Sequence, residues 1–263
     1  MNHTRKPRIG IIGMGHYIYW AQFDGLREEL MRKQRELPAF FSGESDLIDL
    51  GFVDDIDSSY AALKKAQKED LDALFIVMAT DVPSAVVFPF AKYLRIPQVL
   101  VGLQPLAHLD YANTTTYVQL CNDDICSMPE FAGVYERLGA PRPFFIVDSA
   151  VNRERITERI RTLERAIAAV SAFKYAKFGY LGHTYDGMYD MNTDPTAFSA
   201  TFGAHVKMLE LCELREDVNG TTDAEVRAKI DEIRSVFDIR EPSHDPLTDY
   251  VADGDLDLAA RCA

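Results

Sequence analysis

Short, uninterrupted apolar runs recur along this chain, and longer amphipathic stretches separate them. The clearest run, 73–78 (ALFIVM), contains no polar residue, which is typical of a parallel strand buried on both faces. Because strands separated by helices form βαβ units, the pattern predicts an α/β fold with a doubly wound parallel sheet, Rossmann-like or flavodoxin-like. The other expected strands are 8–13, 47–53, 97–102 and 144–147, and the expected helices include 23–36, 58–68 and 152–173.

Local signals place helix ends and the loops where a ligand is expected. Ser58 or Ser59 is the expected N-cap of the second helix, and Pro83 is expected to begin the third, because the first turn of a helix tolerates a missing N–H. Ligands of open parallel sheets bind beyond the carboxyl ends of the strands. The loops to search are therefore 14–22, 54–59, 79–83 and 104–116.

A second unit is predicted to follow the first, so that the domains span 1–174 and 175–263. The second unit has expected strands at 177–181 and 205–211, and Thr222 with Glu225 gives a capping-box signature for a helix that ends near Phe237. Two strands and two helices cannot make a well-covered sheet alone. We therefore expect this second α/β domain to be incomplete in this sequence, and to be finished by further residues or by a partner chain.

The charge of the chain argues against two classes of partner. With 28 basic and 41 acidic residues, the formal net charge is −13, which repels nucleic-acid phosphates and anionic lipids. No stretch approaches the roughly 20 apolar residues of a membrane helix, and the N-terminus does not resemble a signal peptide. Four sparse cysteines do not form a disulfide framework, so reduced thiols and a cytoplasmic location are expected.

Gly10, Gly13 and Gly15 follow the first strand without the spacing of a dinucleotide-binding fingerprint. Their order is GxxGxG, and the next residues, HYIYW, leave little room for a pyrophosphate. The candidate ribose-binding acids, Asp54 and Asp55, come about 40 residues later rather than about 20. A tight turn is the favoured interpretation. The aromatic cluster either packs under the loop or stacks on a ligand.

Other catalytic motifs are absent from the sequence. No histidine pair has metal-motif spacing, and there is no nucleophile elbow or P-loop. The acids beside Cys121 and Cys126 are expected to raise the pKa of both thiols, so neither is expected to be reactive. Dispersed acids could ligate a hard cation, although a solvated surface is the simpler interpretation: Asp186, Asp190, Asp194, Glu210 and Glu213.

The loop within 179–190 (GYLGHTYDGMYD) carries the most informative mixture of side chains. After a strand-like start it places a histidine, two tyrosines, two acids and a methionine in one loop. Polyol recognition uses such acceptors, donors and apolar faces together, although a polar surface loop is the alternative. Segment 113–116, with Asp110 and Gln119 nearby, offers a comparable hydroxyl-matching set or a capping loop.

Four stretches resemble the L-arabinose/L-fucose isomerase family, in particular its fucose-isomerase-like branch. They are 13–26, 101–113, 179–194, and 201–205 with Glu210 and Leu214. The resemblance implies an N-terminal doubly wound domain, a central α/β domain and a separate C-terminal domain. It also implies interconversion of aldoses and ketoses, usually with Mn²⁺, in a homo-oligomer whose sites lie between subunits.

The same resemblance implies which residues contact a monosaccharide. Tyr19 matches a substrate-pocket position, Gln119 a polar residue contributed to a neighbouring subunit, and Met188, with His183 beside it, the loop that closes over the sugar. The family's metal ligands come from regions beyond this sequence, so no catalytic or metal-binding residue is assigned, and the chain alone is expected to bind sugar weakly without turnover. The alternatives are a non-catalytic sugar-binding or regulatory short homologue, and an unrelated nucleotide-using Rossmann-like enzyme.

Overall fold

The chain divides into two compact units, Met1–Lys174 and Tyr175–Ala263, in a computed structural model that describes residues 5–239 and 253–263. The first unit contains a five-stranded, all-parallel sheet in the order β2-β1-β3-β4-β5. The prediction of a doubly wound parallel sheet is therefore confirmed. The strands are β1 (Arg8–Met14), β2 (Asp46–Val53), β3 (Ala73–Met78), β4 (Gln98–Gln104) and β5 (Phe144–Ser149).

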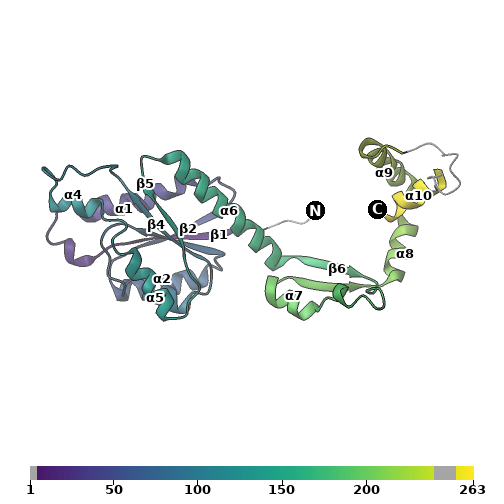
Figure 1. Ribbon diagram of the computed structural model, residues 1–263, viewed down its shortest axis with the longest axis horizontal. Coiled ribbons are helices and arrows are strands. Elements are labelled where there is room, and N and C mark those ends of the chain that lie inside the picture. Colours follow the sequence, from purple (N-terminus) through teal and green to yellow (C-terminus); the bar gives the residue numbers. More distant parts are fainter. Residues whose placement is uncertain (1–4, 240–252) are drawn as a thin grey trace. The chain divides into compact units, whose positions relative to one another are not determined.

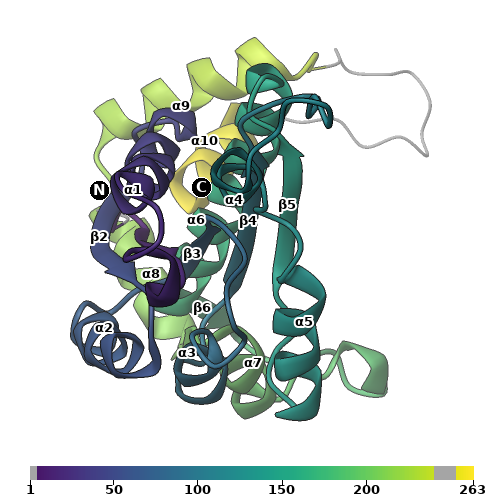
Figure 2. The ribbon, with the colours of Figure 1, turned by 90° about the vertical axis from the view of Figure 1, so that its left-hand side faces the viewer.

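Helices cover both faces of this sheet, as Figures 1 and 2 show. On one face, alternate residues of β3 such as Leu74 and Ile76 pack against α2 (Ile56–Lys68), α3 (Phe88–Tyr93) and α5 (Met128–Arg137). The intervening residues, such as Phe75, face α6 (Arg153–Tyr175) on the opposite side. Since each face of β3 is covered, no position along it tolerates a polar side chain, which explains its continuous apolar run.

The predicted starts of α2 and α3 are not those of the structure. The N-cap of α2 is Asp55, whose carboxylate accepts the backbone N–H of Ser58 (2.7 Å), so the cap expected at Ser58 or Ser59 is wrong. The helix expected at Pro83 begins at Phe88 instead. The backbone N–H of Val82 donates to Oγ of Ser127 (2.7 Å), and this bond ties the loop before α3 to a distant segment.

Helices α1 (Leu26–Glu36) and α4 (Thr116–Cys121) pack together beside the ends of the strands. Leu26 and Leu30 of α1 share an apolar cluster with Leu120 of α4 and with Ala79, which follows β3. Thr115 caps α4 by accepting the backbone N–H of Val118 (3.3 Å), so segment 113–116 contains a helix cap. Of the helices that the structure describes, none is long and apolar enough to span a membrane.

In its described residues, the second unit holds a two-stranded parallel sheet and four α-helices. Strands β6 (Lys177–Leu181) and β7 (His205–Leu209) are joined through α7 (Pro195–Phe202), and α8 (Leu211–Gly220), α9 (Asp223–Val236) and α10 (Asp253–Cys262) follow. The capping box predicted from Thr222 and Glu225 is confirmed at the start of α9. The strand expected to reach residue 211 ends at Leu209, because Glu210 and Glu213 form another capping box that begins α8.

Asp148, at the carboxyl end of β5, fastens the start of α6 to the sheet. Its buried carboxylate accepts hydrogen bonds from Nε of Arg155 (2.6 Å), Nδ2 of Asn152 (2.7 Å) and the backbone N–H of Ser149 (2.7 Å). These partners, the Arg155 hydrogen bond first, hold the pKa of Asp148 well below its usual range. The carboxylate is therefore charged in the folded chain even in mild acid.

We expect Asp148→Asn to lower the free energy of unfolding of the first unit at pH 7 by about 1.5–3 kcal/mol, the range for hydrogen bonds to charged groups. Because the pKa is lower in the folded than in the unfolded chain, this stabilisation is complete above the unfolded pKa of ~4 and is lost as the pH falls towards the folded pKa. Urea unfolding at pH 7 and pH 3 tests this prediction. The difference in free energy of unfolding between variant and parent should be smaller at pH 3 than at pH 7. An equal difference at both pH values would contradict the prediction.

Candidate functional site

The sheet order places a topological switch point between β1 and β3. The chain passes from β1 to β2 on one side, and then returns to continue with β3 on the other side of β1. At such a point the connections leave the carboxyl ends of neighbouring strands in opposite directions, and ligands of open α/β sheets bind there. In this chain the segments that leave those two ends begin at Gly15 and Ala79.

Asp81, just after β3, is the centre of a polar cluster at this point. One oxygen of its carboxylate, Oδ2, accepts the hydroxyl of Tyr19 (3.0 Å). The other, Oδ1, accepts the hydroxyl of Ser127 (2.9 Å) and the thiol of Cys126 (3.3 Å). Partial burial acts to raise the pKa of Asp81, but the hydrogen bonds from Ser127, Cys126 and Tyr19 outweigh it and hold the pKa below the ordinary value. Asp81 is therefore an ionised acceptor at neutral pH.

Tyr19 and Cys126 remain protonated beside this carboxylate. Desolvation, followed by the hydrogen bond and charge of Asp81, raises the pKa of Tyr19 to about 12. Desolvation is also the main reason that the pKa of Cys126 rises to about 12, with Asp123 and Asp81 adding to it. The expected rise in the pKa of the Cys126 thiol is confirmed, although desolvation contributes more to it than the neighbouring acids do.

Aromatic and imidazole rings lie next to Asp81 on the loop after β1. The ring of His16 meets those of Tyr19 and Tyr17 edge to face, at centroid distances of 5.1 and 5.6 Å. Its Nδ1 is buried and has no hydrogen-bond partner among the described residues. Trp20 donates its indole N–H to Oδ2 of Asp54 (2.8 Å), while Tyr17 is 58% exposed. The loop thus carries both the exposed ring of Tyr17 and the hydroxyl of Tyr19 that the Asp81 carboxylate accepts.

Gly13 and Gly15 make room for neighbouring side chains. A Cβ at Gly13 would lie 2.5 Å from Cδ2 of Phe52, and one at Gly15 would lie 2.7 Å from the same ring and 3.0 Å from Trp20. The next α-helix begins only at Leu26, so its N-terminus does not directly follow β1 as a pyrophosphate cradle requires. This packing agrees with the tight-turn interpretation of the glycines.

We expect Gly13→Ala to lower the free energy of unfolding by about 1–3 kcal/mol, because the added methyl group overpacks the contact with Phe52. Gly133 is a matched control, since it lies inside α5 and a Cβ there would meet no atom within 4 Å. Gly133→Ala should raise the stability by roughly 0.5–1 kcal/mol. Urea unfolding followed by Trp20 fluorescence measures both changes, and a Gly13→Ala protein as stable as its parent would contradict the prediction.

The four residues predicted to contact a sugar fall in both units. Tyr19 belongs to the Asp81 cluster, and Gln119 is an exposed residue of α4. In the second unit, His183 lines a cavity of about 230 Å³, where Oγ1 of Thr184 donates to Oδ1 of Asn192 (2.6 Å). Met188 is 47% exposed and is not among the residues that line this cavity. Each of the four residues therefore has a side chain that is at least partly accessible.

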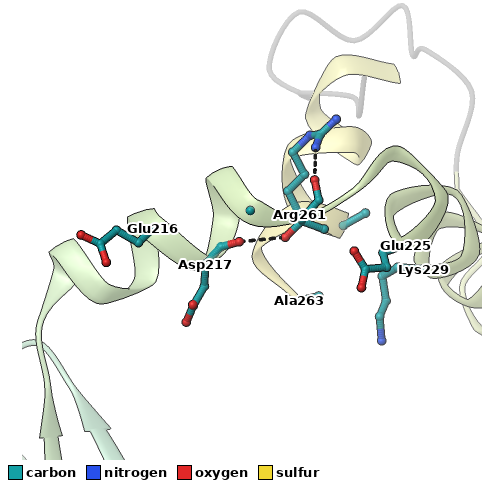
Figure 3. Close-up of a pocket in the computed structure, with 9 residues that line it drawn as sticks. Glu216, Asp217, Glu225, Lys229, Arg261 and Ala263 are labelled. Carbon is teal, nitrogen blue, oxygen red and sulfur yellow. Dashed lines mark hydrogen bonds between the residues drawn. The ribbon is translucent and has the colours of Figure 1, made fainter.

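A larger, open pocket of about 450 Å³ lies among the last three helices of the second unit (Figure 3). Glu216 and Asp217 come from α8, and Glu225 and Lys229 from α9. The guanidinium of Arg261 donates to the backbone oxygen of Thr221 (3.1 Å) and pairs with Asp223 (2.9 Å) and Asp257 (2.9 Å). Arg261 is thus engaged in joining α10 to the start of α9.

The described residues do not fit a resident metal ion. Within residues 5–239 and 253–263 there is no group of three or more His, Cys, Asp or Glu side chains that could hold one. The dispersed acids considered in the sequence, such as Asp186 and Asp190, therefore form no such group. This part of the chain supplies no ligand set for the Mn²⁺ that the family resemblance implies.

Neither Asp81 nor Ser127 was predicted from the sequence as a site residue. The loop 79–83 is among those expected to face a ligand, and an acid directly beyond a fully buried strand is the available signal for Asp81. Ser127 carries no comparable signal, because it reaches the site through the connection between β4 and β5.

Comparison with known protein families and with curated proteins finds no match.

Proposed function

We propose that the first unit binds a neutral monosaccharide at the Asp81 cluster, and that it supplies the sugar-binding wall of an aldose–ketose isomerase of the L-arabinose/L-fucose isomerase type. The observation that carries this proposal is the ionised carboxylate of Asp81, which accepts the hydroxyl of Tyr19 on the loop that also carries the exposed ring of Tyr17. A carboxylate accepts hydrogen bonds from adjacent sugar hydroxyls, and an aromatic face packs on the C–H face of a sugar ring.

The hydrogen-bonding capacity of the cluster matches a hydroxyl-rich ligand. Oδ2 of Asp81 accepts only Tyr19 among the described residues, so it retains a lone pair for a ligand hydroxyl. The net charge of −13 disfavours phosphorylated ligands, which leaves neutral sugars as the better match.

Isomerisation itself requires groups that this cluster does not supply. Proton transfer between adjacent carbons needs polarised carbonyl and hydroxyl oxygens and a base with a suitable pKa. On the family resemblance, we propose that a metal centre outside the described residues completes the site within a cytoplasmic homo-oligomer. The chain by itself would then bind aldoses without converting them.

Trp20 provides a direct test, because it is the chain's one tryptophan and lies beside the proposed site. Titration with L-fucose, L-arabinose and other aldoses should change its fluorescence saturably, whereas NADH should not. Ketose should not form from these aldoses in the presence of Mn²⁺. Quenching by NADH with indifference to every aldose would overturn the proposal in favour of a nucleotide-using protein. Turnover by this chain alone would overturn the catalytic part of the proposal.

A further inference from the structure

A separate cavity in the first unit lies at the amino ends of the strands, away from Asp81. Its volume is about 280 Å³, close to the lower end of the ~300–1,000 Å³ range of small-molecule sites. Pro97 and Val99 line it where β4 begins, and Phe144 lines it where β5 begins. All of its lining residues belong to the first unit.

One face of α6 forms the opposite wall of this cavity. Its lining residues recur at the three- and four-residue spacing of a single helix face: Leu163, Ala166, Ile167, Val170, Ser171 and Lys174. Towards the start of α6, Ile156 and Ile160 are fully buried, whereas Val170 is 63% exposed. Ile167 and Ser171 continue the buried stripe of α6, and the cavity lies beside this C-terminal part of the helix.

The lining of the cavity is mostly apolar, and two of its residues, Arg95 and Lys174, are cationic. Arg95 is exposed, and its guanidinium makes no hydrogen bond or ion pair within the part of the chain that the structure describes. The acid in the lining, Asp72, is already paired, since its Oδ2 accepts the backbone N–H of Arg8 (2.8 Å) and lies 3.6 Å from Nη2 of Arg5. Ser171, also in the lining, is 2% exposed, and its hydroxyl has no partner among the described residues.

We propose that this cavity binds an amphipathic monoanion of the medium-chain carboxylate class. The alkyl chain would lie along the apolar face of α6, where burial of apolar area favours binding. The carboxylate would pair with Arg95, whose guanidinium matches the geometry of a carboxylate. A sugar lacks the apolar surface that this lining requires, so the site is chemically distinct from the Asp81 cluster.

Calorimetric titration of the full chain with decanoate, and with decanol as its neutral counterpart, tests the proposal. Decanoate should bind with a stoichiometry of one. Arg95→Gln should weaken decanoate binding by about tenfold and leave decanol binding unchanged, since only the carboxylate pairs with the guanidinium. Ala166→Trp should fill the cavity and abolish binding of both ligands. Ala169→Trp, at an exposed α6 position outside the lining, is the matched control and should bind like the parent.

Three results would overturn the proposal. They are the absence of saturable decanoate binding, equal effects of Ala166→Trp and Ala169→Trp, and equal weakening of decanoate and decanol by Arg95→Gln. If the chain self-associates and does not bind decanoate, and Ala166→Trp abolishes the self-association, this face is instead an interface between copies of the chain. None of these outcomes depends on whether Asp81 binds a sugar.

Discussion

Lys33→Met should lower the free energy of unfolding of the first unit by about 3–5 kcal/mol, the cost of leaving one buried charge without its partner. Lys33 lies on α1, and its side chain is only 7% exposed. Its ammonium group donates to Oδ1 of Asp124 (2.7 Å) and to the backbone oxygens of Ala79 (2.8 Å) and Cys121 (2.7 Å). One side chain thus ties α1 to the end of β3 and to the segment around α4.

The electrostatics of this pair explain the size of the expected effect. Burial lowers the pKa of Lys33 and raises the pKa of Asp124 to about 7, so each charge depends on the other for stabilisation. Oδ2 of Asp124 is buried and has no hydrogen-bond partner among the described residues. Without Lys33, the Asp124 carboxylate would therefore be left with little compensation for its lost hydration.

Urea unfolding followed by Trp20 fluorescence measures this loss in the unit that contains the pair. The double variant Lys33→Met/Asp124→Asn should recover a large part of it, because no buried charge remains. Lys64→Met, at an exposed position of α2, is the matched control and should change stability by less than about 0.5 kcal/mol. A double variant no more stable than Lys33→Met would show that the unpaired carboxylate is not the cause.

The five strands could be predicted because their signal is local. Each buried parallel strand is a short apolar run, and its neighbours along the chain mark its ends, as in 73–78. Helices α4 and α5 were not predicted between the fourth and fifth strands. Helix α4 has only six residues, and Pro129 lies in the first turn of α5, so neither gives a long periodic signal.

The candidate site depends on contacts that local patterns do not encode. Tyr19 and Asp81 are 62 residues apart in sequence, and Ser127 lies 46 residues beyond Asp81. The strand order brings the first two together, and that order could be anticipated only in outline from the βαβ pattern. The position of Ser127 depends on the path between β4 and β5, which includes the unpredicted helices. A polar cluster was therefore foreseeable at this edge of the sheet, but its membership was not.

Asp81→Asn should weaken aldose binding by roughly 10- to 100-fold, which corresponds to the ~1.5–3 kcal/mol of a hydrogen bond to a charged group. Asparagine keeps the shape of the side chain: its oxygen can accept one of the two hydroxyls, Tyr19 or Ser127, and its NH2 group can donate to the other, so the fold should be retained. It loses the negative charge and the second acceptor oxygen that a sugar hydroxyl would use. Tyr19→Phe should have a smaller effect, about 2- to 10-fold, because it removes a single neutral donor.

The pKa of Asp81 adds a pH dependence to this prediction. Because its hydrogen bonds hold that pKa below the ordinary value, the carboxylate stays ionised from pH 8 down to pH 5, and aldose affinity should be constant over that range. Titrations of Trp20 fluorescence at several pH values measure this. Asp46→Asn, an exposed change at the start of β2, is the matched control and should bind like the parent. If Asp81→Asn binds aldoses as tightly as Asp46→Asn does, the Asp81 carboxylate is not the sugar acceptor, and the proposed site must lie elsewhere.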